Sequence, residues 1–152
     1  MSQSLEEELR VCLKSLYLST IRACYYEQAE LARKEALSYE QYLFQLAQRE
    51  CEVRWQKRIA RLLRESKLPH DKTFASFDRS RLPRQLDAQI SALLDGSFLT
   101  RCENVLAFGN PGSGKTHLLC ALSDALIHKG HRVKFYPCAL LVQALLAAKR
   151  DL

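Results

Sequence analysis

Proline and glycine are scarce in this chain of 152 residues, which has 4 of the first and 5 of the second. None of them precedes Pro69, so neither residue type forces a helix to end in the first 68 positions. The chain also lacks an apolar run of the roughly 18 residues that a membrane span needs. Its acidic start, with Glu6, Glu7 and Glu8, does not resemble a secretory signal. We therefore expect a cytoplasmic protein with no membrane partner.

Clustered metal ligands are missing as well. The 6 cysteines are scattered without any C-x-x-C pair, and the 4 histidines are not grouped. This distribution is typical of reduced thiols in a cytosol and argues against a zinc site or a disulfide framework. The histidines, including His117, are interpreted as ordinary surface or loop residues.

Residues 109–116 match the pattern G-x-x-x-x-G-K-[ST] at every fixed position. Glycines allow successive N–H groups to point inward around an anion, and the helix that follows adds the positive end of its dipole. Lys115 supplies a charge for the β- and γ-phosphates, while the Thr116 hydroxyl is placed to bind Mg²⁺. The alternative, a plain glycine-rich turn, would need neither of these side chains. The pattern predicts a nucleoside triphosphate site formed by Gly109, Asn110, Pro111, Gly112, Ser113, Gly114, Lys115 and Thr116.

The first part of the chain reads as helix. Apolar residues recur at helical spacing over residues 5–33, which predicts one helix there. Ser38 and Gln41 form a capping box, which predicts a second helix that continues to about Ser66. We therefore expect an all-helical domain over residues 1–66. Residues 67–103 are expected to be a linker followed by a lead-in helix that begins near Pro83 and ends near Gly96.

The last part of the chain alternates between strand-like apolar runs and apolar residues at helical spacing. Residues 104–108 and 132–136 read as short buried strands, and helices are expected from Gly114 to about Lys129 and over residues 139–149. Strand, phosphate loop, helix, strand and helix in this order are the start of an α/β nucleotide-binding fold. Residues 104–152 would form the N-terminal part of that domain.

The positive charge is concentrated in two segments. Within a net charge of +6, residues 109–152 carry 6 basic and 2 acidic side chains, and residues 49–67 carry 7 basic and 3 acidic ones. Basic residues recur there every three or four positions, which is the electrostatic footprint of a surface that binds the backbone of DNA or RNA. A solvated helix face is the alternative, and Trp55 beside it is assigned to the core. The candidates for DNA contact are Arg54, Lys57, Arg58, Arg61 and Arg64.

Several segments together give the chain a family resemblance. The chain resembles IstB, the ATP-binding helper of an insertion-sequence transposase, in five segments. These are residues 73–78 (TFASFD), 80–83 (SRLP), 103–106 (ENVL), the phosphate loop with the His117 and Leu118 that follow it, and 130–135 (GHRVKF). The resemblance covers essentially the whole chain and lies in the AAA+ branch that also contains DnaC-like helicase loaders. It implies ATP and Mg²⁺ as cofactors, ATP-dependent assembly on double-stranded DNA, and a transposase or helicase as partner.

The chain departs from that family in one respect. ATPases of this kind need an acidic residue after an apolar strand, and here Asp124 lies inside a predicted helix while Asp151 is at the end of the chain. No catalytic residue is assigned, so we expect phosphate binding without efficient hydrolysis, in an incomplete αβα sandwich that is truncated at its C-terminus. A helicase loader and a partner-binding adaptor with an inert ATPase remnant remain the alternative functions.

Overall fold

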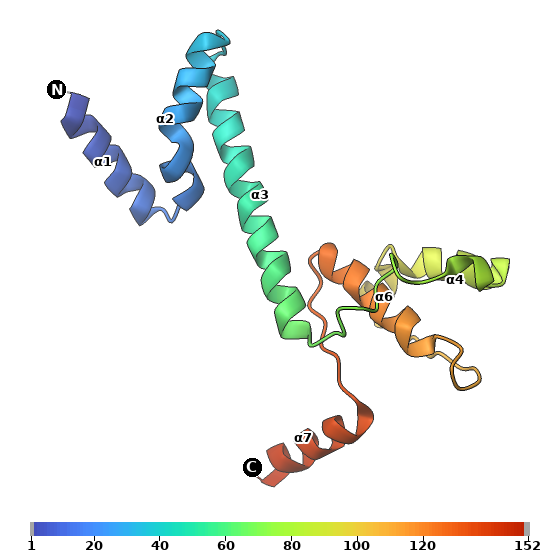
Figure 1. The fold of residues 1–152 in the computed structure, drawn as a ribbon. Helices are drawn as coiled ribbons and strands as arrows, with labels where there is room; N and C mark the ends of the chain where they lie inside the picture. Colours follow the sequence, from blue (N-terminus) through green and yellow to red (C-terminus); the bar gives the residue numbers. More distant parts are fainter. Residues whose placement is uncertain (1, 151–152) are drawn as a thin grey trace. The chain divides into compact units, whose positions relative to one another are not determined.

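The computed structural model describes residues 2–150. The chain divides into two compact units between Arg58 and Ile59. Every regular element within residues 2–150 is helical (Figure 1). In chain order these are α1 (Ser2–Ser15), α2 (Ser19–Lys34), α3 (Tyr39–Ser66), the 3₁₀ helix η1 (Arg79–Arg81), α4 (Arg84–Leu93), α5 (Ser97–Thr100), α6 (Lys115–His128) and α7 (Cys138–Arg150).

The first unit contains a helix break that the sequence pattern did not predict. The single helix expected over residues 5–33 is wrong, because α1 ends at Ser15 and α2 begins at Ser19. Tyr17 between them has a left-handed backbone, with φ of 57°. The Leu18 N–H donates to the Leu13 carbonyl at 2.9 Å, which closes the end of α1. A left-handed residue at this place ends a helix without glycine or proline.

The capping box that begins α3 is confirmed. The Ser38 N–H donates to Gln41 Oε1 at 2.9 Å, and the Gln41 N–H donates to Ser38 Oγ at 3.2 Å. This reciprocal pair gives partners to two backbone N–H groups at the start of the helix. The prediction of one long helix that ends near Ser66 is confirmed too.

The second unit is organised around α6, whose two sides are buried against different helices. Ile127 packs with Ile59 and Leu62 from the last turns of α3. Leu122 and Leu126 pack with Phe98 of α5. Residues from α3 beyond Arg58 therefore belong to the core of the second unit.

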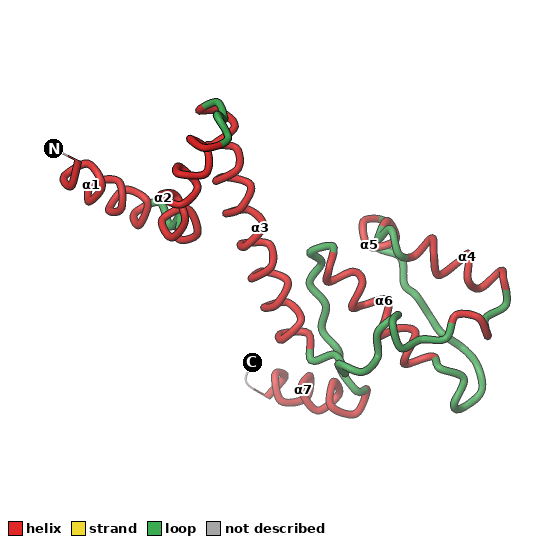
Figure 2. Tube along the Cα trace, turned by 45° about the horizontal axis from the view of Figure 1, so that its top comes forward, coloured by secondary structure: helices red, strands yellow, loops and turns green. Residues whose placement is uncertain are grey.

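The two predicted strands are absent from the described part of the chain. Residues 104–108 and 132–136 belong to irregular segments, and Figure 2 shows no strand within residues 2–150. Leu106 and Phe108 are 75% and 88% exposed, and the Phe135 N–H donates instead to the Ser66 carbonyl at 2.8 Å. A strand is defined by hydrogen bonds to a neighbouring strand, and these segments have no such neighbour among the described residues. The two strands predicted for an α/β sheet are therefore not formed within residues 2–150, where the regular structure is helical.

The remaining helix predictions are close to the structure. α4 follows Pro83, α6 ends one residue before Lys129, and α7 spans the expected region, whereas the short α5 was not predicted. No helix within residues 2–150 has the length and apolar character needed to cross a membrane.

Candidate nucleotide-binding site

The loop of residues 109–114 connects an extended segment to the first turn of α6. Gly114, the N-cap of α6, has φ of 82°. A Cβ there would meet Phe77 Cε2 at an ordinary 3.5 Å, so the backbone conformation rather than space requires glycine. At Gly109, with φ of 154°, a Cβ would lie 3.0 Å from Ser113 Oγ, so both conformation and space favour glycine.

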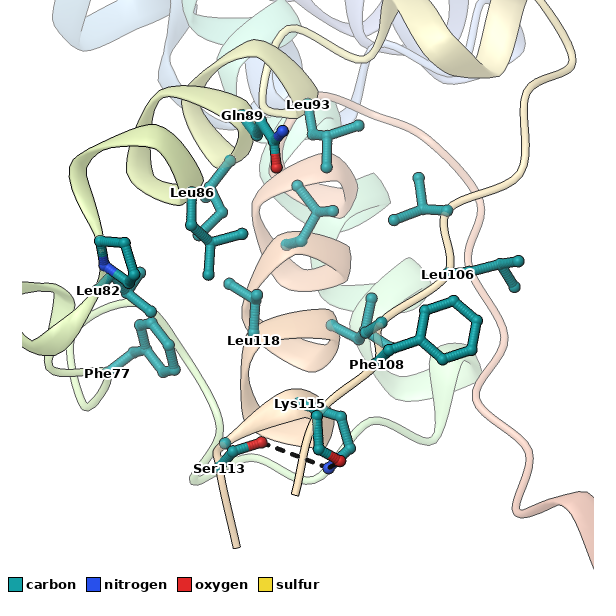
Figure 3. A pocket seen from close by; sticks show the side chains of 18 residues that line it. Phe77, Leu82, Leu86, Gln89, Leu93, Leu106, Phe108, Ser113, Lys115 and Leu118 are labelled. Atoms are coloured by element: carbon teal, nitrogen blue, oxygen red, sulfur yellow. Dashed lines mark hydrogen bonds between the residues drawn. The ribbon is translucent and has the colours of Figure 1, made fainter. Parts of the chain in front are cut away.

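Lys115 folds back over this loop. Its Nζ donates to the carbonyls of Gly109 at 2.9 Å and Asn110 at 2.7 Å, and lies 3.4 Å from Ser113 Oγ (Figure 3). The ammonium group is thus held at the mouth of the loop, beside the free N–H groups at the start of α6. Both the helix dipole and the lysine make this end of α6 positive, as an anion site requires.

Thr116 lies apart from that arrangement. The residue lines a different cavity of about 430 Å³, together with Lys134 and Tyr136. The structure therefore brings Lys115 together with the loop, while Thr116 borders a second hollow. The loop positions Asn110, Pro111 and Gly112 are exposed.

A larger cavity of about 610 Å³ opens directly beside the loop (Figure 3). Its lining comes from the α4 region, α6 and the segment before the loop, and it includes Phe77, Leu86, Leu118, Gly114 and Lys115. Most of this lining is apolar, and its volume falls within the range of small-molecule sites, roughly 300–1,000 Å³. The cavity gives the charged loop an apolar neighbour, an arrangement that fits a ligand with both a phosphate and a flat organic part.

The residue after Thr116 holds the segment that carries Phe77. His117 Nε2 lies 3.1 Å from the Thr73 carbonyl and 3.2 Å from Ser76 Oγ. The imidazole also packs edge-on against Phe77, with ring centroids 5.1 Å apart. The interpretation of His117 as an ordinary loop residue missed this role. The signal available in the sequence was its position, directly after the loop and in the same set of segments as residues 73–78.

The basic residues proposed for DNA contact all lie on α3 and are all exposed. Arg54 is engaged within the first unit, since it donates to Glu50 at 2.8 Å and to the Tyr17 carbonyl at 2.6 Å. Trp55 is 44% exposed, with the Arg58 guanidinium 5.8 Å from its ring centroid. Its assignment to the core is therefore wrong.

Three of the five basic positions differ from Arg54 in their partners. Arg61 lies 3.9 Å from Glu65, at the outer limit of an ion pair. Among the described side chains, none forms a hydrogen bond or an ion pair with Lys57 or Arg64. Of the five candidates, Lys57 and Arg64 are therefore the two with no such partner among the described side chains.

Comparison with known proteins decides the family. Residues 11–152 match the IstB-like ATP binding protein family. The chain belongs to this family. It is 39% identical over 148 residues to a protein of Sinorhizobium fredii that is named as an insertion sequence ATP-binding protein. This match covers 97% of the chain and 50% of the relative. It is 35% identical over 145 residues to a protein of Pseudomonas aeruginosa named for ATP binding in insertion sequence IS21, covering 95% and 54%.

A third relative, from Geobacillus stearothermophilus and named for ATP binding in insertion sequence IS5376, is 32% identical over 147 residues, covering 97% of the chain and 59% of the relative. The chain therefore spans about half the length of the curated relatives that it matches. The resemblance drawn from the sequence segments is confirmed at the level of the family.

Within residues 2–150, carboxylates form no metal-binding cluster at the phosphate loop of this IstB-like chain. Asp124 lies on α6 with Oδ2 3.6 Å from His128 Nδ1, and Asp151 lies outside the described residues. Within residues 2–150, no three His, Cys, Asp or Glu side chains are grouped as a metal site would require. In this part of the chain, the Thr116 hydroxyl is the group of the phosphate-loop motif that could ligate Mg²⁺.

Proposed function

We propose that this chain binds a nucleoside triphosphate, in the family's case ATP, through residues 109–116. The observation that carries the proposal is the position of Lys115, whose ammonium group lies against the Gly109 and Asn110 carbonyls at the N-terminus of α6. A triphosphate entering here would meet the lysine, the helix dipole and the unpaired N–H groups of the first turn together. Membership of the IstB-like ATP binding family supports ATP as the nucleotide.

Mg²⁺ is proposed as the second cofactor. Thr116 would supply its hydroxyl, while the phosphates and water would complete the octahedral shell. Nucleotide affinity should therefore depend on Mg²⁺, and Thr116→Ala should reduce that dependence.

The direct test is equilibrium binding of a fluorescent, non-hydrolysable ATP analogue with Mg²⁺ to the 152-residue chain. Lys115→Ala should weaken binding by about tenfold or more, because a charged contact to phosphate is lost. Lys149→Ala, which removes an exposed lysine from α7, is the matched control for charge. Equal affinity in the Lys115→Ala variant and the unchanged chain would refute the proposed site.

We further propose that these 152 residues bind the nucleotide without turning it over. Hydrolysis needs a carboxylate that positions water or metal near the γ-phosphate. Asp124, the acidic residue of α6, is directed to His128 on its own helix. Phosphate release by the 152-residue chain should stay at the level of the buffer control, and release that disappears in Lys115→Ala would contradict this.

Association with double-stranded DNA is proposed through the basic side chains of α3, with Lys57 and Arg64 as the principal contacts. Each contact to a DNA phosphate releases counterions, so affinity should fall steeply as salt rises. The exposed Trp55 provides an intrinsic fluorescence signal for the titration. Lys57→Ala should reduce the salt slope by about 1, whereas Lys34→Ala, an exposed lysine on α2, should leave it unchanged. A salt-insensitive signal would instead favour the protein-binding adaptor.

Within these functions, a helper of a transposase is favoured over a DnaC-like helicase loader. The support is that the relatives described above are named for insertion sequences. ATP-dependent self-association on DNA is part of the same proposal. Sedimentation of the chain with duplex DNA, with and without the ATP analogue, tests this proposal. A mass of the protein–DNA complex that is the same with and without the nucleotide would refute it.

A further inference from the structure

The turn of residues 71–77 is closed by a hydrogen-bond network that centres on Ser76. Its hydroxyl donates to the Asp71 carbonyl at 2.6 Å and accepts the Thr73 N–H at 3.2 Å. Two further neighbours of Ser76 Oγ are the Thr73 carbonyl at 3.1 Å and His117 Nε2 at 3.2 Å. The single hydroxyl proton serves one acceptor at a time, and the Asp71 carbonyl is nearer than the Thr73 carbonyl, which leaves the Ser76 oxygen placed to accept from the histidine.

The same reasoning settles which ring nitrogen of His117 carries a proton. The Thr73 carbonyl, 3.1 Å from Nε2, is also an acceptor. A carbonyl can only accept, so this contact requires that Nε2 carry the N–H.

His117 follows Thr116 on the first turn of α6, and the turn it holds carries Phe77. Phe77 lines the 610 Å³ cavity and would touch a Cβ at Gly114 at 3.5 Å. His117 thus ties this aromatic wall to the first turn of α6, while Phe74 of the same turn packs on the cluster of Phe98, Leu122 and Leu126. If the wall moved, the phosphate loop would keep its own glycines and lysine.

We propose that His117 is a positioning residue for the nucleotide site, which fixes Phe77 and the turn of residues 71–77 against the phosphate loop so that the nucleoside part of the ligand is held. This inference rests on the proposed nucleotide binding. It assigns the phosphates to the loop and the selectivity for a nucleoside over bare polyphosphate to the turn that His117 holds.

The test compares two probes, a non-hydrolysable ATP analogue and inorganic tripolyphosphate, by calorimetry with Mg²⁺. His117→Ala should weaken binding of the nucleotide by about five- to tenfold, the equivalent of one lost hydrogen bond, and binding of tripolyphosphate by less than about twofold. His117→Gln should restore most of the loss, because its amide nitrogen is the same number of bonds from the backbone as Nε2. His128→Ala, on the same helix, is the control and should change neither affinity.

A second measurement follows the turn itself. The Ser76 and Phe77 N–H groups donate within it, to the Thr73 and Phe74 carbonyls at 3.3 and 3.4 Å. Nucleotide should slow hydrogen exchange of these amides in the unchanged chain and in His117→Gln, but not in His117→Ala.

Each other outcome has a definite meaning. If His117→Ala weakened the binding of tripolyphosphate and of the nucleotide equally, or changed neither affinity, the inference would be overturned and the proposed phosphate site would stand. Failure of the unchanged chain to bind either probe would refute the nucleotide site and the role of His117 with it.

Discussion

Glu50 of α3 caps the first turn of α2 through Thr20, whose N–H donates to Glu50 Oε2 at 2.8 Å. The Ile21 N–H donates to the same oxygen at 3.0 Å, and Arg54 Nε lies 2.8 Å from the other one. Glu50 is only 4% exposed. A carboxylate from residue 50 thus satisfies two of the backbone donors that a helix start leaves unpaired.

Glu50→Gln should destabilise the first unit at neutral pH. Burial favours the neutral acid, but hydrogen bonds from the two backbone N–H groups and from Arg54 outweigh it and hold the pKa of Glu50 below its ordinary value. The contribution is therefore complete above the unfolded pKa of about 4.3 and is lost as pH falls through the lower folded value. We expect a loss of about 1–3 kcal/mol at pH 7, the cost of weakening a buried charged hydrogen-bond centre.

Thermal unfolding of the unchanged chain and of Glu50→Gln between pH 7 and pH 3 measures this loss of stability. The difference between them should shrink as pH falls below 4. Glu27→Gln, an exposed residue of α2, serves as the control and should track the unchanged chain. A difference that is constant across the whole range would show that Glu50 acts by packing alone.

The capping box at the start of α3 gives a second prediction. Ser38→Ala removes the acceptor of the Gln41 N–H and should cost about 1 kcal/mol in the free energy of unfolding. Urea titration followed by circular dichroism is suitable, with Gln56→Ala, an exposed position in the middle of α3, as the control. Equal midpoints for both variants would mean that the box contributes nothing measurable.

A third prediction concerns the contact between the end of α3 and α6. Ile127 is fully buried against Ile59 and Leu62, so Ile127→Ala should cost about 2–5 kcal/mol through lost burial and the cavity left behind. Leu141→Ala, 40% exposed on α7, should cost well under half of that. If the two substitutions lowered the melting temperature equally, this core would not form in solution.

Cys120 gives a fourth prediction. The side chain is 2% exposed, and burial raises the pKa of its thiol, so little thiolate is available for reaction. Brief alkylation at pH 7.5 followed by mass spectrometry should label the exposed Cys138 and Cys102 and leave Cys120 unmodified until urea is added. Labelling of Cys120 as fast as Cys138 would contradict the packing of α6.

Local signals in the sequence predicted those features whose causes are local. The phosphate-loop pattern, the capping box of Ser38 and Gln41, and the end of α6 before Lys129 and Gly130 each depend on residues within a few positions of one another. The family resemblance was also readable, because it rests on short segments of fixed spacing. These features needed no knowledge of distant contacts.

What only the tertiary structure decided involves partners far apart in the chain. The break between α1 and α2 coincides with the cap from Glu50, some 30 residues away, and periodicity alone cannot reveal such a cap. The role of His117 depends on Ser76, at a separation of 41 residues. Residues 104–108 have a strand-like composition, yet they stay irregular in the described structure because a strand requires a partner to accept and donate its hydrogen bonds. The sequence by itself determined where helices and the phosphate loop lie, and the long-range hydrogen bonds decided how they end and which side chains serve the loop.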